Sequence, residues 1–87
     1  MKQERVLNVS ELAPPGPMEA ILEAIETLTP GHYLRVLHNR EPFPLYTILD
    51  EYGYRHCIRD GTDTLFEIFI WRKDDATAKE AIDTAMK

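Results

Sequence analysis

The chain has 87 residues, of which 44% are hydrophobic and 29% charged, a composition typical of folded proteins. This length fits one small core, so we expect a single domain over residues 1–87, with a core at about 5–72 and a tail or helix at 74–87. The net charge of -5 disfavours nucleic acid and anionic membranes as partners. A charged N-terminus and the lack of any run of about 20 apolar residues predict a cytoplasmic protein without a signal peptide or membrane span.

The first half of the chain predicts a strand, a helix and a strand. A β-branched run at residues 5–10 predicts the first strand, and a proline-rich turn follows it. From Pro17, which suits the first helical position, apolar residues recur at the spacing of an amphipathic helix up to Leu28. Gly31 is the expected stop, and alternation at residues 32–38 predicts the second strand.

The second half predicts another helix, a hairpin and a weak final segment. Apolar residues at helical spacing up to Tyr52 predict the helix, with Gly53 as its stop. Two β-rich runs, residues 54–59 and 64–71, flank an Asp-Gly-Thr-Asp turn and predict the hairpin. Residues 74–87 carry a weak helical spacing, which leaves a short C-terminal helix and a frayed tail both open.

These elements follow the order β-α-β-α-β-β. Strand-helix-strand crossovers on one sheet are almost always right-handed and leave their strands parallel. We therefore expect an α/β fold of the two-layer α+β sandwich type, a four-stranded mixed sheet with both helices on one face. The side chains expected to face the helices are Leu34, Val36, Ile58, Phe66, Ile68 and Ile70.

Three segments, "LNVSEL", "LTPGHYL" and above all "LHNREPFPLYTILDEYG", resemble a known family. Over roughly residues 6–72 the chain resembles the small bacterial family known as domain of unknown function twenty-two forty-nine, which is similar in turn to TusA/SirA-type sulfur carriers. The resemblance implies a TusA/SirA-like fold. Carriers of the TusA type hold a reactive cysteine in a Cys-Pro-x-Pro turn, and the matching position here is Pro14, which has no thiol. The resemblance therefore implies the fold without sulfur transfer at this turn.

The run "HNREPFPLY" is the candidate ligand site. Ligands of open α/β sheets bind beyond the carboxyl ends of parallel strands, so the Pro14 turn and the loop from His38 should meet there, beside two helix N-termini. Arg40 could hold a carboxylate or phosphate with His38 as a second donor or a metal ligand, and Glu41 and Tyr46 complete the set. The structural alternative is that the prolines only start a helix and that Arg40 pairs with Glu41.

A metal or haem site would depend on histidines alone. His32 and His38 share one predicted strand but would lie roughly 20 Å apart, too far to share an ion. His56 could meet His38 only if their strands bring the two together. We predict no metal and no cofactor; haem or metal binding at this edge stays an alternative, because some proteins with this family's domain also carry hemerythrin-like iron domains.

Cys57 is the single cysteine, so the chain can form no internal disulfide and no thiolate metal cluster. It alternates with Arg55 and Arg59 on a predicted strand. We expect a small apolar side chain that fills space. The alternative is a reactive thiol, whose pKa the two guanidinium groups could lower.

An apolar surface is predicted on the last strand. Leu65, Phe69 and Trp71 should point away from the two helices. Either the C-terminal segment folds back over them, or a protein partner or a second copy of the chain covers them.

The sequence shows no nucleophile-base pair, glycine loop for phosphate or carboxylate dyad, which argues against an enzyme. The leading hypothesis is a small non-catalytic binding or adaptor domain with a protein partner or homodimer. It would act through the Pro14/His38/Arg40 edge, the Leu65/Phe69/Trp71 face, or both, and binding of a small anion at the first of these is an alternative. The alternatives are sulfur or redox transfer through Cys57, and RNA binding through Arg35, Arg55 and Arg59.

Overall fold

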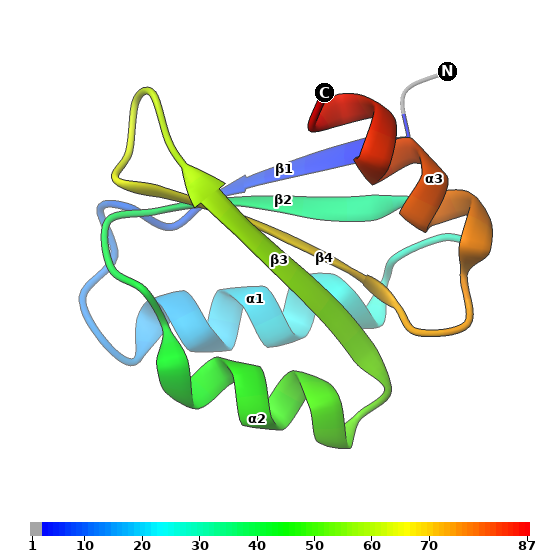
Figure 1. The fold of residues 1–87 in the computed structure, drawn as a ribbon. Helices are drawn as coiled ribbons and strands as arrows, with labels where there is room; N and C mark the ends of the chain where they lie inside the picture. The colour runs from blue at the N-terminus through cyan, green and yellow to red at the C-terminus, as the bar shows by residue number, and fades with distance from the viewer. Residues whose placement is uncertain (1–2) are drawn as a thin grey trace.

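The chain forms a mixed sheet with helices on both faces (Figure 1). The computed structural model describes residues 3–87. The elements in chain order are β1 (Glu4–Asn8), α1 (Gly16–Glu26), β2 (Tyr33–His38), α2 (Phe43–Glu51), β3 (Tyr54–Asp60), β4 (Phe66–Arg72) and α3 (Ala76–Ala85). The strand order is β1-β2-β4-β3, with β1 parallel to β2 and β4 antiparallel to both of its neighbours. Helices α1 and α2 lie on one face of the sheet and α3 on the other. The predicted four-stranded sheet and helix pair are confirmed, and the C-terminal segment is a helix.

The two predicted glycine stops behave differently. Gly53 follows the end of α2 with a φ of 83°, a conformation that glycine adopts without strain, so this stop is confirmed. Helix α1, however, ends at Glu26, before the predicted stop. The amides of Thr27 and Leu28 donate to carbonyls three residues earlier, which tightens the chain out of the helix. Gly31, also at φ 83°, instead makes the turn into β2.

The core between the sheet and the helix pair contains most of the residues predicted for it. Inward side chains of β2 and β4 pack against buried residues of α1 and α2. Ile58 packs at the margin of this cluster, whereas Phe66, at the first position of β4, does not belong to it. The fully enclosed members are Ile21, Leu34, Val36, Leu45, Leu49, Ile68 and Ile70.

A second, smaller core lies under α3. Phe69 and Trp71 are 0% and 6% exposed, and they pack with Ala78 and Ile82 of this helix. Asp75 fixes the start of the helix, because its carboxylate accepts from the amides of Ala78 at 3.0 Å and Gly31 at 2.7 Å. The C-terminal segment thus provides the cover for Phe69 and Trp71.

Helix α3 therefore covers most of the predicted apolar surface. Of its three residues, Leu65 alone stays open, at 65% exposure. Leu65 precedes β4, in the turn that follows β3, and it does not belong to the cluster that packs under α3.

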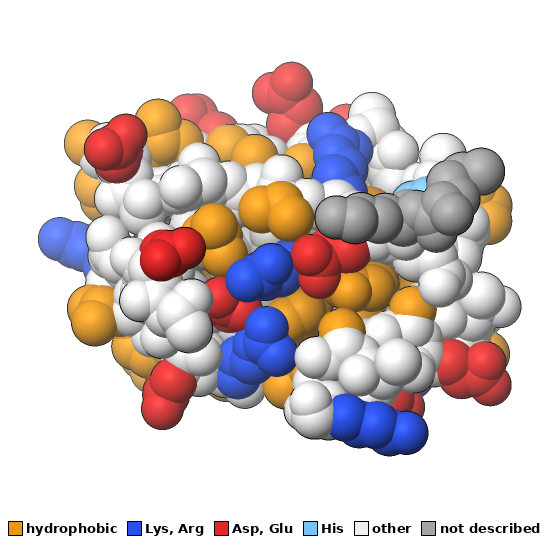
Figure 2. All heavy atoms as spheres, turned by 90° about the horizontal axis from the view of Figure 1, so that it is seen from above, with side chains coloured by type: hydrophobic (Ala, Val, Ile, Leu, Met, Phe, Trp, Pro, Cys, Tyr) orange, Lys and Arg blue, Asp and Glu red, His pale blue; other side chains and the backbone are white. Residues whose placement is uncertain are grey.

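Charged side chains occupy the part of this face that α3 leaves open, where positive and negative groups lie next to one another (Figure 2). The Glu67 carboxylate is buried and accepts from Arg35 at 2.9 Å and from Arg59 at 2.8 Å. The Arg35 hydrogen bonds are the main reason why the pKa of Glu67 is lowered. Arg35 also contacts Glu4 at 3.3 Å. Two of the arginines considered for RNA binding are therefore already paired with carboxylates.

Shortening Ile82 to alanine should show that α3 is docked. Ile82 is 1% exposed, and such truncations in a core cost about 2–5 kcal/mol of unfolding free energy. Urea unfolding followed by the fluorescence of Trp71 measures this change directly. Glu80→Ala on the exposed side of the same helix is the control, with an expected change within about 0.5 kcal/mol. Equal effects of the two variants would show that α3 does not pack on the sheet.

Candidate functional site

A cavity of about 390 Å³ lies where β1 and β2 end and where α1 and α2 begin. The Pro14 turn and the His38 loop both line it, as the crossover topology predicted. Its polar side chains are those of Ser10, His38, Asn39, Arg40 and Glu41. Its apolar lining consists of Val9, Leu12, Pro14, Pro15, Pro17, Met18, Pro42 and Pro44.

Prolines shape this cavity, since five of the six in the chain line it. Helices α1 and α2 each have a proline at the N-cap and another at the second position: Pro15 and Pro17 in α1, and Pro42 and Pro44 in α2. Proline fixes the backbone for a helix start but has no N–H to donate. Because the amides of the first residues, Gly16 and Phe43, already donate to Ala13 and Glu41, the two helix starts have few amides left for a ligand.

His38 is the most buried polar group in the lining, at 6% exposure. The backbone amide of Arg40 donates to its Nδ1 at 3.1 Å. Burial is the main reason why the pKa of this imidazole is lowered, and the positive charge of Arg40 lowers it further. Because Nδ1 accepts a hydrogen bond, a neutral His38 carries its proton on Nε2.

Arg40 and Glu41 are not partners. The Arg40 guanidinium is exposed and forms no ion pair with any side chain of residues 3–87. The Glu41 carboxylate instead accepts from the Tyr46 hydroxyl at 3.3 Å. The predicted structural role of Arg40 as the partner of Glu41 is therefore wrong, and this lining residue has no carboxylate partner within residues 3–87.

Tyr46 contacts the lining residue Glu41 but does not itself line the cavity. Its ring stacks on His56, with centroids 3.9 Å apart and planes at 5°. Burial and the neighbouring Glu41 raise the pKa of Tyr46 to about 12, so it stays a hydrogen-bond donor. Burial also lowers the pKa of His56.

The histidines do not assemble into a metal centre. His32 has its Nδ1 3.2 Å from the carbonyl of Pro30, and His56 faces Tyr46. Within residues 3–87, no group of three or more His, Cys, Asp or Glu side chains is placed to hold a metal ion.

Cys57 lies under α3, where its thiol contacts the Met86 sulfur at 3.6 Å. Burial raises the pKa of the thiol and outweighs the opposing effects of Lys79 and Arg59. The alternative of a thiol with a lowered pKa is therefore wrong, because desolvation of the thiolate outweighs the effect of Arg59.

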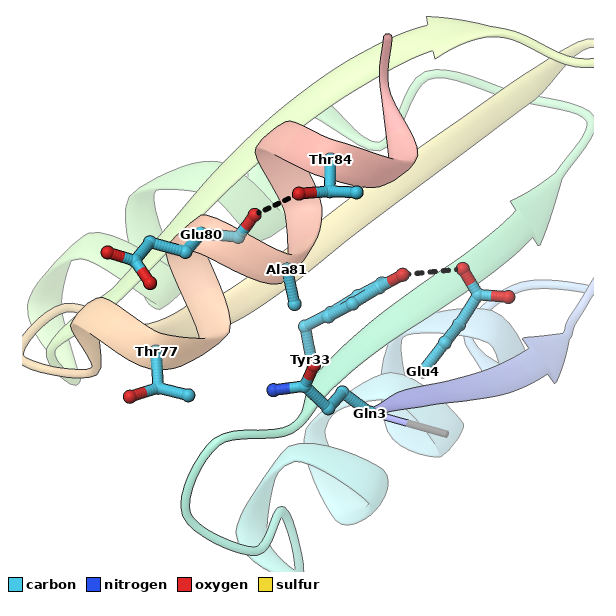
Figure 3. Close-up of a pocket in the computed structure, with 7 residues that line it drawn as sticks. All are labelled: Gln3, Glu4, Tyr33, Thr77, Glu80, Ala81 and Thr84. Atoms are coloured by element: carbon cyan, nitrogen blue, oxygen red, sulfur yellow. Dashed lines mark hydrogen bonds between the residues drawn. The ribbon is translucent and has the colours of Figure 1, made fainter. Parts of the chain in front are cut away.

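Sequence reasoning did not find Val9, Leu12 and Met18 as parts of the cavity, nor a second, polar cavity of about 470 Å³ beside α3 (Figure 3). In the second cavity the hydroxyl of Tyr33 donates to Glu4 at 2.8 Å. Its lining consists of Gln3, Glu4, Tyr33, Thr77, Glu80, Ala81 and Thr84. These residues come from the start of β1, the start of β2 and the final helix, so only the positions of these three elements in the fold could have indicated that they line one cavity.

Acid should destabilise the protein through its buried histidines. Below the ordinary histidine pKa of 6.5, the unfolded chain takes up protons that His38 and His56 resist when folded, so stability falls as the pH falls. His56→Phe keeps a ring against Tyr46 but does not titrate, so it should lose less stability between pH 7.5 and 5.5 than the parent. Urea midpoints at both pH values measure this.

Tyr46→Phe is the control, because it keeps both the stack and the titrating His56. It should therefore show the pH dependence of the parent protein. An unchanged pH dependence in His56→Phe would contradict the assignment.

Among residues 3–87, the structure contains no helix of the length and hydropathy needed to cross a membrane. No curated protein and no solved structure is significantly similar to the chain. One family does match, described as "Uncharacterized conserved protein (DUF2249)", over residues 6–72. This match extends from β1 to the last residue of β4 and includes every residue that lines the proline-rich cavity. The chain therefore belongs to the DUF2249 family of uncharacterised conserved proteins.

Proposed function

We propose that this chain is a small non-catalytic binding domain whose site is the proline-rich cavity. The observation that carries the proposal is the meeting of two loops, distant in sequence, around the buried imidazole of His38. A volume of about 390 Å³ lies within the usual range of small-molecule sites, about 300–1,000 Å³. Such sites combine an apolar lining with a few converging polar groups, as this cavity does.

The lining favours a ligand with an apolar body. An apolar body the size of one leucine or phenylalanine side chain would contribute about 1.5–3 kcal/mol on burial. After the entropic costs of binding, the affinity from such contacts alone would be on the order of 1 mM or weaker. A tighter ligand therefore needs the polar groups at the rim.

Binding fits the polar groups better than catalysis does. Ser10, the one hydroxyl in the lining, donates to the Asn8 side chain at 2.6 Å and so does not direct its proton at a base. His38 already uses Nδ1 within the fold. Pro14 lines the cavity at the position where the resemblance to sulfur carriers would require a cysteine, which supports binding without sulfur transfer. A protein partner or a homodimer stays a prediction.

The test is an amide NMR titration of the chain with hexanoate, hexanamide and hexylammonium. At least one of these should shift signals confined to the cavity lining. Leu12→Asp, which places a charge in the apolar lining, should weaken that binding at least fivefold. Leu65→Asp is the matched control, because Leu65 is also exposed but lies outside the lining. Scattered shifts, or equal weakening in both variants, would overturn the proposal.

A further inference from the structure

We propose that the proline-rich cavity selects ligands with a single carboxylate on an apolar body, held by the Nε2–H of His38 and the guanidinium of Arg40. This inference rests on the proposed function and specifies the ligand class of the same site. It follows from the hydrogen bond at Nδ1, the free charge of Arg40 and the scarcity of other donors.

The orientation of His38 makes its second nitrogen a donor. The Arg40 amide can only donate, so the Nδ1 it contacts at 3.1 Å must present a lone pair, and the ring proton is on Nε2. No side-chain nitrogen or oxygen that is fully buried within residues 3–87 lacks a partner. Nε2 has no hydrogen bond within that part of the chain, so it is not fully buried, and His38 is a lining residue of the cavity. A ligand that reaches it must offer an acceptor.

The same hydrogen bond disfavours a metal ion or haem iron. A metal at Nε2 would take the lone pair there and leave the proton on Nδ1, as in most metal-bound histidines, where Nδ1–H donates to an oxygen. Here the Arg40 amide already points its own hydrogen at Nδ1, so two donors would face each other. Metal binding would therefore break the turn from His38 to Arg40.

The charged side chains of the lining favour a ligand with one negative charge over a ligand with two. Arg40 contributes one positive charge, and the neighbouring Glu41 carboxylate lies in the same lining. A dianionic phosphate would therefore be left with uncompensated charge, and the prolines remove the helix-start amides that usually bind phosphate. A carboxylate needs only two donors, and this lining offers one imidazole N–H and one guanidinium.

The test compares hexanoate with hexanamide, which has nearly the same shape but no charge. Hexanoate should bind at least tenfold tighter than hexanamide, and millimolar inorganic phosphate or Zn²⁺ should not displace it. Arg40→Gln should weaken hexanoate at least fivefold and leave hexanamide unchanged. Arg55→Gln, an exposed arginine outside the cavity lining, is the control and should change neither affinity.

A long-range nitrogen-proton spectrum of the unliganded protein reads the state of the His38 ring directly. A protonated Nε2 and an unprotonated Nδ1 are expected. The opposite tautomer, or Zn²⁺ shifts centred on His38, would overturn the inference.

The outcomes separate this inference from the proposed function. Equal binding of acid and amide in the cavity would retain the binding function and overturn the carboxylate selectivity. Failure of all three amphiphiles to bind there would overturn both.

Discussion

The burial of both faces of β4 is the constraint on which the rest of the structure depends. β4 lies between β2 and β3, so the two strands that flank α2 in sequence are held parallel without touching. Ile68 and Ile70 face α1 and α2, while Phe69 and Trp71 face α3. A strand of this kind needs apolar residues at consecutive positions, which explains the unbroken apolar run from Ile68 to Trp71. β4 therefore contributes side chains to the cores of both helical layers.

Glu67 is the exception within that strand, and it divides the α3 face in two. In one part of this face, Phe69 and Trp71 are buried under α3. In the other part, the Glu67 carboxylate forms ion pairs with Arg35 and Arg59. A buried carboxylate costs free energy unless it is paired, so the arginines are needed where they are. This half of the face stays open to solvent without presenting a large apolar patch (Figure 2).

Hydrophobic periodicity predicted the elements that bury a large apolar face. It did not predict the loops or the directions of side chains near the surface. The spacing in α1 and the alternation in β2 reflect large apolar faces, and the crossover rule placed the Pro14 turn beside His38. The weak pattern of α3 left its helix undecided, because that helix depends on contacts with Phe69 and Trp71 rather than on its own propensity.

The missed parts of the site share one cause. Leu12 lies in an irregular loop whose path no repeat determines. Glu41 turned out to contact Tyr46 rather than Arg40, and desolvation raised the pKa of Cys57, because side-chain direction and burial come from tertiary packing.

The placement of the chain ends has a consequence for how this domain can be attached to other proteins. β1 starts at the end of the sheet opposite the proline-rich cavity, and α3 ends on the face that α1 and α2 do not touch (Figure 1). Neither Gln3 nor any residue of α3 lines the cavity. The site can therefore remain accessible in a fusion at the N-terminus, at the C-terminus or at both.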